Sequence, residues 1–349
     1  MCIPLFILAI VLFVSIRPSK DVLLSSYNSM PQTQAIKGFF VVTIFFSHFC
    51  SYIQFEQWYD KILQEYCQFL GQLMVAPFLF YSGYGIFESV KKKGLAYIKD
   101  FPKKRILKTL LHFDFAVILF LLLDFIIDRS VSIVEFLYAL IAWESIGNSN
   151  WFVFAILCEY VFVFIGLAIF KANLKRILIF VFAMSLAYIA LVSRLKGSYY
   201  WFDTVIAFPL GCFMSLYKVH LENLMRKRMF ATGGAIISLL LFILAKTGFI
   251  PIYFLNTQLA LVAFCSVIVF FSLHVRVNSS VLIWFGSFVF EIYILQRIPM
   301  NFLATIKLNE ENIYMFFIIS FVFTLCLSLI VSKWNNFFDR FVLEKVSKH

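Results

Sequence analysis

Long apolar segments follow one another from one end of the chain to the other, separated by short polar connections. Lipid offers no hydrogen-bond partners to the backbone, so apolar runs of about 17 to 25 residues are interpreted as transmembrane helices rather than strands. The pattern predicts an all-α polytopic integral membrane bundle with ten core helices. The expected spans are residues 36–54, 68–87, 108–127, 151–170, 177–193, 201–217, 229–249, 254–275, 282–304 and 312–333.

Two further apolar stretches are too short for an ordinary span. Residues 3–16 lack a positive region before them and a small-residue cleavage site after them, which favours an uncleaved extra N-terminal helix over a signal peptide. Residues 131–146 are interrupted by Glu135 and closed by Glu144 and Gly147, so we expect a re-entrant or interfacial segment there.

Composition rules out a soluble protein. Hydrophobic residues make up 62% of the 349 positions, and charged residues make up 14%, against about 25% in soluble domains. The mean hydropathy is +0.91. So little charge cannot cover a water-exposed surface, which excludes secreted, nuclear and cytosolic proteins. The seven cysteines have neither a disulfide framework nor CxxC spacing, so no metal is expected.

The basic residues predict the orientation in the membrane. The net charge of +11 could suggest nucleic acid binding, but Lys and Arg are concentrated in short segments between the apolar runs. With the C-terminus in the cytoplasm, 23 of the 30 Lys and Arg residues lie on the inner side. We therefore expect a multi-pass protein of the inner cell membrane, in contact with the lipid bilayer and not with nucleic acid.

The chain has no internal repeat and no linker rich in Pro or Ser. The expected division is an N-terminal hydrophobic helix and cytoplasmic linker (1–35), one membrane domain (36–333) and a cytoplasmic tail (334–349).

A few ionisable or strongly polar groups fall at membrane depth, where each needs a partner or a function. His48 lies 11 residues after Lys37, about 16 Å along a helix, and Glu159 has nearly the same depth in its own helix. The same estimate places Gln296 and Arg297 slightly closer to the outer surface of the membrane than His48. These side chains are candidates for a polar layer that holds a hydrophilic substrate arriving from outside. Interhelical packing is the alternative, both for His48 and for a carboxylate paired with Arg297.

The connection over residues 91–108 carries eight cations and one acid. Anchoring against anionic lipid would explain its charge. The spacing of Lys104, Arg105 and Lys108 at the start of the next helix favours a second interpretation, in which these side chains converge on phosphate groups at the inner surface.

These residues resemble the acyltransferase-3 family of polytopic membrane proteins, which O-acetylate bacterial glycans. Lys37 and His48 in KGFFVVTIFFSH match the family's basic residue followed after ten residues by histidine. FLFYSGYGIF places Ser82 and Tyr84 on a Phe-rich motif, and Arg105 with Lys108 matches a pair of arginines. Weaker matches surround Trp151 in NSNWFVFAILCEY, the segment DTVIAFPLG, and both Ser287 and Tyr293 in GSFVFEIYILQ.

The resemblance implies an O-acetyltransferase that takes its acetyl group from cytosolic acetyl-CoA and transfers it to an extracytoplasmic glycan or lipid-linked sugar. His48 would be the general base or the acyl carrier, with Glu159 as a second catalytic candidate. Acetyl-CoA would be bound by the four cations Lys37, Lys104, Arg105 and Lys108. Contacts to substrate or oxyanion would come from Ser82, Tyr84, Trp151, Tyr293, Gln296 and Arg297.

Three positions depart from the family pattern. Lys37 and Lys108 stand where Arg is usual, and Lys cannot make a planar bidentate contact. Gln296 stands where many members have a second His, which leaves His48 as the strongest acid–base candidate.

A transporter or flippase of a lipid-linked sugar is the rival interpretation, and it predicts discontinuous helices in two related halves of the chain.

Overall fold

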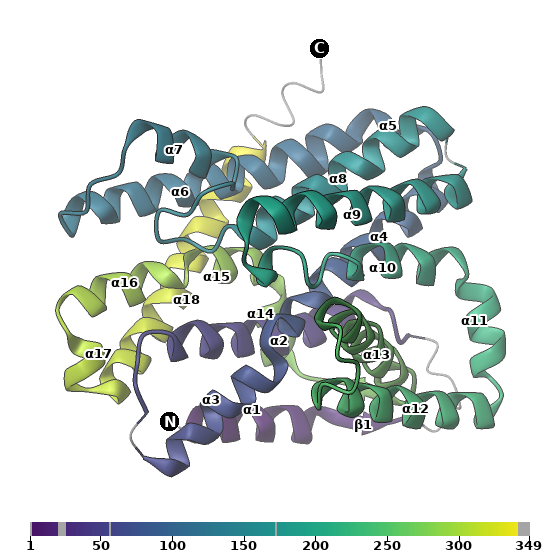
Figure 1. Cartoon of the computed structure of the whole chain (residues 1–349), viewed down its shortest axis with the longest axis horizontal. Helices are drawn as coiled ribbons and strands as arrows, with labels where there is room; N and C mark the ends of the chain where they lie inside the picture. The colour runs from purple at the N-terminus through teal and green to yellow at the C-terminus, as the bar shows by residue number, and fades with distance from the viewer. Residues whose placement is uncertain (1, 20–25, 56, 172, 341–349) are drawn as a thin grey trace.

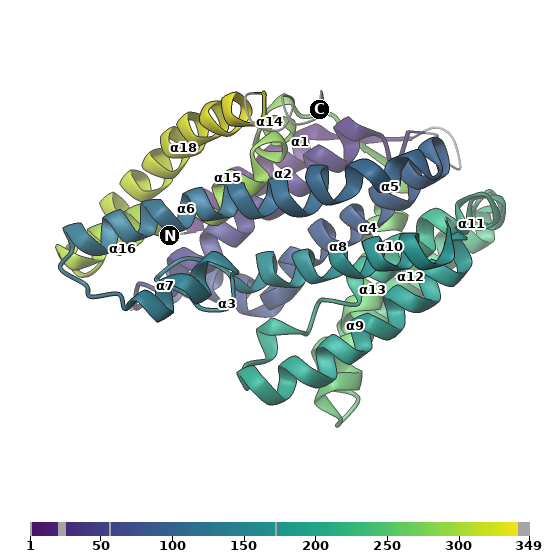
Figure 2. The same cartoon turned by 90° about the horizontal axis from the view of Figure 1, so that it is seen from above.

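The computed structural model describes residues 2–19, 26–55, 57–171 and 173–340. In these ranges the chain forms a bundle of helices with one two-stranded ladder (Figures 1 and 2). Its elements are α1 (Cys2–Ser15), β1 (Ile16–Pro18), α2 (Met30–Cys50), α3 (Trp58–Leu70), η1 (Gly71–Val75), α4 (Ala76–Lys93), α5 (Ala96–Phe101), η2 (Pro102–Leu107), α6 (Lys108–Ile126), α7 (Ile133–Leu140), α8 (Trp151–Phe170), α9 (Leu174–Lys196), η3 (Tyr199–Trp201), α10 (Ala207–Leu216), α11 (Lys218–Met225), α12 (Arg228–Lys246), α13 (Tyr253–His274), β2 (Val275–Val277), α14 (Ser280–Ser287), α15 (Val289–Leu295), α16 (Arg297–Thr305), α17 (Leu308–Glu311) and α18 (Ile313–Phe338).

Among the described residues, eight helical stretches are long and apolar enough to cross a membrane, and a bent pair makes a ninth. The all-α polytopic membrane fold is thereby confirmed. The count of ten stays a prediction, because the expected span 201–217 contains only the ten-residue helix α10. The segment expected at 3–16 does form α1, but 14 residues reach only about 21 Å, less than a bilayer core.

The predicted ninth span is broken rather than straight. Ser280–Ser287 and Val289–Thr305 meet at an angle of 64°. Sharp helix kinks commonly occur at Gly and Ser pairs, and Gly286 and Ser287 stand directly before this break. The bend sets the direction of α15 and α16, which carry Tyr293 and Arg297.

Glycine lets two helix pairs approach closely. A Cβ atom added to Gly38 would lie 1.9 Å from the carbonyl oxygen of Leu282, so α2 packs backbone to backbone on α14. A Cβ atom on Gly83 would lie 2.2 Å from the carbonyl oxygen of Phe208, which joins α4 to α10 in the same way. Small residues at helix contacts are the usual means of tight packing in lipid. These contacts hold the helices that carry Lys37, His48 and Ser82.

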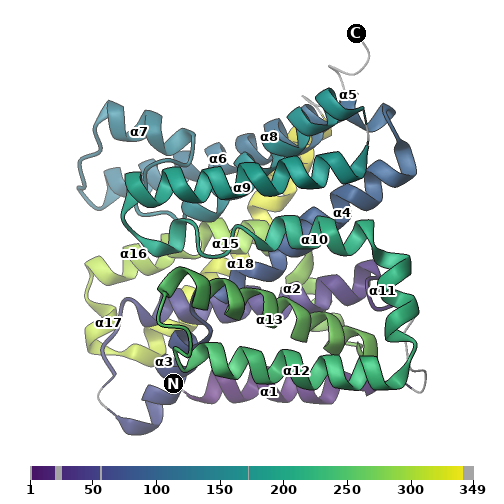
Figure 3. The same cartoon turned by 45° about the vertical axis from the view of Figure 1, so that its right-hand side comes forward.

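The connecting segments lie at two opposite ends of the bundle. Figures 1 and 3 show α5 and α11 toward the right, whereas α7 and α17 lie toward the left. Segments predicted to share a side of the membrane, 91–105 with 218–228, thus lie at one end. The assignment of that end to the cytoplasm rests on the cation bias.

Three segments outside the main spans refine the expected boundaries. Residues 131–146 contain the short helix α7, whose capping box joins Ser132 and Glu135 and keeps the pKa of Glu135 below its usual range. The expected cytoplasmic linker contains β1, which pairs antiparallel with β2. Helix α18 continues to Phe338, into the expected tail, whose residues 341–349 lie outside the described part of the chain.

Candidate active site

We call the end of the bundle at α5 and α11 the inner end and the end at α7 and α17 the outer end, after the orientation predicted from the cations. Helix α2 carries parts of the candidate site at both ends. His48 lies eleven positions after Lys37, which is about three helical turns, so the two side chains project from the same face about 16 Å apart. Most positions between them are buried, and Val41 and Phe45 are fully buried. The helix therefore connects its two ends through the packed interior.

His48 sits near the outer end of α2 against the helix that follows the break. The centroid of its ring lies 6.2 Å from that of Tyr293. Its Nδ1 atom is buried and has no hydrogen-bond partner among the described residues. The charge of Arg297 is close enough to act on the imidazole. A buried imidazole nitrogen without a protein partner is free to exchange a proton with a substrate.

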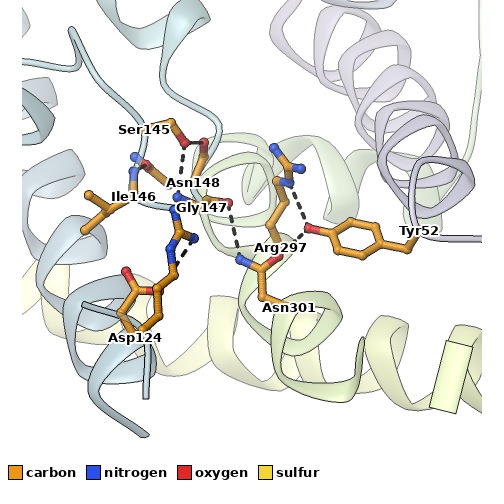
Figure 4. A network of polar contacts seen from close by, with 9 residues as sticks. Tyr52, Asp124, Ser145, Ile146, Gly147, Asn148, Arg297 and Asn301 are labelled. Carbon is orange, nitrogen blue, oxygen red and sulfur yellow. Dashed lines mark hydrogen bonds and ion pairs between the residues drawn. The ribbon is translucent and has the colours of Figure 1, made fainter. Parts of the chain in front are cut away.

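Arg297 is held by a tyrosine rather than by a carboxylate (Figure 4). Its Nε atom donates a hydrogen bond of 3.0 Å to the Tyr52 hydroxyl, and its guanidinium lies 5.6 Å from the centre of that ring. The Tyr52 hydroxyl in turn donates to Asn301 Oδ1, and Asn301 Nδ2 donates to the Gly147 carbonyl at 3.4 Å. No ion pair neutralises Arg297 in the part of the chain that is described.

Tyr293 and Gln296 precede Arg297 at the junction of α15 and α16. Gln296 is fully buried at the junction of α15 and α16, and its Nε2 atom donates to the Tyr293 carbonyl at 3.0 Å. Its Oε1 atom is buried without a partner in the described structure. The ring of Tyr293 packs edge to face on Phe152, with 5.1 Å between the centroids. Tyr293 is thus a neighbour of His48, and Gln296 is bonded to the backbone of Tyr293.

Glu159 points elsewhere. Its Oε1 atom accepts a 2.6 Å hydrogen bond from Ser185 on α9, and its side chain is fully buried. The described structure has no hydrogen bond or ion pair between Glu159 and either His48 or Arg297. Trp151 begins the same helix and packs against Tyr200, with 6.1 Å between the ring centroids.

Arg105 is the centre of a second polar cluster, at the inner end. It lies in the π-helical segment η2, and its Nε atom donates a 3.1 Å hydrogen bond to the Tyr97 hydroxyl. The Tyr160 hydroxyl also contacts Arg105, and it is 2.9 Å from Ser82 Oγ. A chain of polar contacts therefore leads from Arg105 to the predicted residue Ser82.

The four predicted donor cations do not converge as one group. Lys37 and Arg105 lie close enough for their charges to act on each other. Lys104 instead pairs with Asp100 at 2.5 Å, with both side chains more than half exposed. Lys108 pairs with Asp339 at 2.5 Å, and His112 reaches the same carboxylate at 3.0 Å. Only Lys37 and Arg105 remain without a carboxylate partner, as far as the described residues go.

Tyr84 belongs to the inner end and not to the layer around His48. The Lys218 ammonium lies 5.9 Å from the centre of its ring, and Lys218 begins α11. The structure therefore separates Tyr84 from Tyr293, although the sequence grouped both as substrate contacts.

Aromatic side chains connect the two clusters. Ser82 lies one turn beyond Phe78 on α4, and the ring of Phe78 packs on Phe152 with 6.1 Å between centroids. Phe152 contacts Tyr293, which contacts His48. This series of rings crosses from α4 through α8 and α15 to α2.

Sequence reasoning missed the tyrosines that hold both arginines. Tyr52, Tyr97 and Tyr160 are three of 16 tyrosines, and in a membrane protein such residues usually mark the interfaces. The available signal was spacing, since Tyr52 follows His48 by four residues and Tyr160 follows Glu159 directly. No group of three or more His, Cys, Asp or Glu side chains that could hold a metal occurs in the described ranges.

Comparison with known proteins adds the chemistry. Residues 33–333 match the model of a family described as an acyltransferase domain, a region that includes both polar clusters. No protein of curated function and no solved structure matches the chain.

Proposed function

The chain belongs to the acyltransferase-3 family, and from this premise we propose that it transfers an acetyl group from cytosolic acetyl-CoA to a hydroxyl group of an extracytoplasmic glycan. We place it in the inner cell membrane with its C-terminus in the cytoplasm. The observation that carries the proposal is the arrangement around α2. On one face of this helix, Lys37 lies about 16 Å from His48, whose Nδ1 atom is buried without a partner in the described structure. Arg105, from η2, adds a second cation beside Lys37.

The donor binds at the inner cluster. Phosphate groups of CoA supply the negative charge that the described structure does not provide to Lys37 and Arg105. Tyr97 and Tyr160 orient the guanidinium of Arg105 without neutralising it, so its other N–H groups can donate to phosphate oxygens. The pantetheine arm then extends past Ser82 and the ring of Phe152 toward His48.

The transfer takes place at the outer cluster. His48 removes the proton from the acceptor hydroxyl, and the hydroxyl oxygen attacks the thioester carbonyl. A C–O bond forms, the C–S bond breaks, and the proton taken up by His48 passes to the leaving sulfur, so that CoA is released as the thiol. Alternatively, His48 accepts the acetyl group first and passes it to the hydroxyl. In both routes the uncompensated charge of Arg297 stabilises the negative charge that develops on the carbonyl oxygen.

Glu159 has a packing role in this proposal. Its hydrogen bond to Ser185 ties α8 to α9, and its nearest polar partners do not include the outer cluster. Gln296 is placed to orient the acceptor through its unpartnered Oε1 atom.

The test compares the surface glycan of a deletion strain with that of strains complemented by the wild-type chain or by the His48→Ala variant. We expect the O-acetyl ester to be absent from the deletion and His48→Ala strains and restored by the wild type. A transporter of lipid-linked sugar would instead lower the amount of glycan and leave its ester content per sugar unchanged. An unchanged ester content in the deletion strain would reject the proposed transfer.

A further inference from the structure

A polar cavity of about 650 Å³ opens at the end of the bundle where α17 lies. It is formed by the connection after α2, the start of α3, and the segment from α17 into α18. Figures 1 and 3 show α3 and α17 as neighbours at this end. Its polar lining includes Gln54, Gln57, Asn309, Asn312, Glu310 and Glu311. Asp60 and tyrosine rings complete the wall, and the described lining residues include no Lys, Arg or His.

Tyr52 belongs both to this cavity and to the outer cluster. Tyr52 lines the cavity, and its hydroxyl accepts the hydrogen bond from Arg297. Asn309 Nδ2 donates to the Tyr52 carbonyl at 2.7 Å, whereas Asn309 Oδ1 is buried with no partner in the described structure. A buried amide oxygen of this kind is costly unless a ligand or water donates to it. The cavity therefore shares Tyr52 with the outer cluster, and one of its lining residues has an unpartnered polar atom.

We propose that this cavity binds the acceptor sugar, and that this sugar is uncharged or bears an amine rather than a carboxylate or phosphate. The inference rests on the proposed function and specifies its acceptor. Amide and carboxylate side chains hydrogen-bond sugar hydroxyls, and tyrosine rings pack on the apolar faces of sugars. No described lining residue is a cation, so the carboxylates of Glu310 and Glu311 repel an anionic glycan and attract an amine.

The test measures glycan binding directly. The full chain in lipid nanodiscs is applied to an array of neutral, amine-bearing and uronic-acid oligosaccharides, each presented both free of lipid and on a lipid anchor. We expect binding to neutral or amine-bearing members and not to uronic acids. Binding to uronic acids alone, or to no oligosaccharide, overturns the inference. A difference between the free and anchored forms tells whether the natural acceptor is carried by lipid.

Variants assign the binding to this cavity. Gln54→Ala with Gln57→Ala removes two exposed amides and should weaken binding of neutral sugars about fivefold. Glu310→Gln with Glu311→Gln should weaken binding of amine-bearing sugars by a similar factor. Thr257→Ala is the matched control, because Thr257 lines a separate polar pocket of about 370 Å³. Equal binding by the wild type and both double variants contradicts the inference.

Acetyl transfer measured on the same preparations separates this inference from the proposed function. Sugar binding that depends on the cavity, without any transfer from acetyl-CoA, rejects the transferase and keeps the binding site. Normal transfer by both double variants rejects the binding site and keeps the transferase.

Discussion

Each of the two polar clusters is built around an arginine that bonds to a tyrosine hydroxyl. Arg105 donates to Tyr97 at the inner end, and Arg297 donates to Tyr52 at the outer end. The clusters differ in the neighbour of the arginine, which is the cation Lys37 in one and the imidazole of His48 in the other.

The neighbour of each arginine indicates what kind of negative charge each cluster accommodates. Two adjacent cations without a carboxylate repel each other, so they favour a ligand that carries permanent negative charge. A single cation beside a proton acceptor favours a negative charge that appears only during the reaction. A tyrosine hydroxyl suits both arrangements, since it orients the guanidinium without neutralising it. The comparison thus separates donor binding from chemistry, and substitutions at the two ends should have different kinetic effects.

The largest effect is expected for His48→Ala at the outer cluster. Loss of an acid–base group lowers turnover by about a thousandfold. The affinity for acetyl-CoA should remain at the wild-type value, because the inner cluster is untouched. The measurement is single-turnover transfer from labelled acetyl-CoA in nanodiscs, together with donor binding by calorimetry. Near-native transfer would return His48 to a packing role.

Gln296→Ala serves as the matched control for that experiment. Gln296 is as deeply buried as the groups around His48, but its amide cannot accept a proton at neutral pH. This variant should keep measurable transfer. If it is as inactive as His48→Ala, general disruption of the buried layer explains both.

The next effect is expected for Arg105 of the inner cluster. Its sequence neighbour Lys104 should behave differently. Arg105→Ala should weaken acetyl-CoA binding by about tenfold to a hundredfold, because a charge-assisted hydrogen bond to phosphate is lost. Lys104→Ala should change it little, since Lys104 is more than half exposed and paired with Asp100. Calorimetric titration of both purified variants provides the measurement. Equal losses would indicate that the whole basic segment acts through its net charge.

A smaller and reciprocal effect is expected for the two tyrosines. Tyr52→Phe should lower kcat by about fivefold with unchanged donor affinity, because Arg297 loses the hydroxyl that orients it. Tyr97→Phe should lower donor affinity by a similar factor with little change in kcat. Steady-state kinetics over a range of acetyl-CoA concentrations separates the two parameters. The distinction between the clusters fails if both variants change the same parameter.

The sequence predicted the membrane spans well, because lipid requires each apolar run to satisfy its own backbone. The expected span 151–170 coincides with α8, and 177–193 lies within α9. The helix observed within the expected span 201–217 is shorter than predicted, because Asp203 and Thr204 lie before its start. Asp203 there accepts a 2.7 Å hydrogen bond from Tyr253 on α13 instead of joining a helical turn.

The grouping of cations was less predictable for two physical reasons. Side-chain directions were inferred from α-helical spacing, but Pro102–Leu107 is π-helical, and this changes the faces from which Lys104 and Arg105 project. In addition, Lys108 forms an ion pair with Asp339, which is distant in sequence and could not be assigned as a partner from spacing. The pairing of Lys37 with Arg105 depends likewise on how α2 packs.

The smallest perturbation tests whether the two clusters face opposite sides of the membrane. Lys92 and Ile306 are exposed residues near the inner and outer ends, and single cysteines there in a cysteine-free chain should leave transfer close to normal. An impermeant thiol reagent applied to intact cells should label Ile306→Cys and not Lys92→Cys, because 23 of 30 basic residues place the 91–105 segment in the cytoplasm. Permeabilised cells provide the control, since both sites should then react. Labelling of Lys92→Cys from outside would place the cation pair of Lys37 and Arg105 on the extracytoplasmic side, where no acetyl-CoA is present, and the assignment of that cluster to the donor would be wrong.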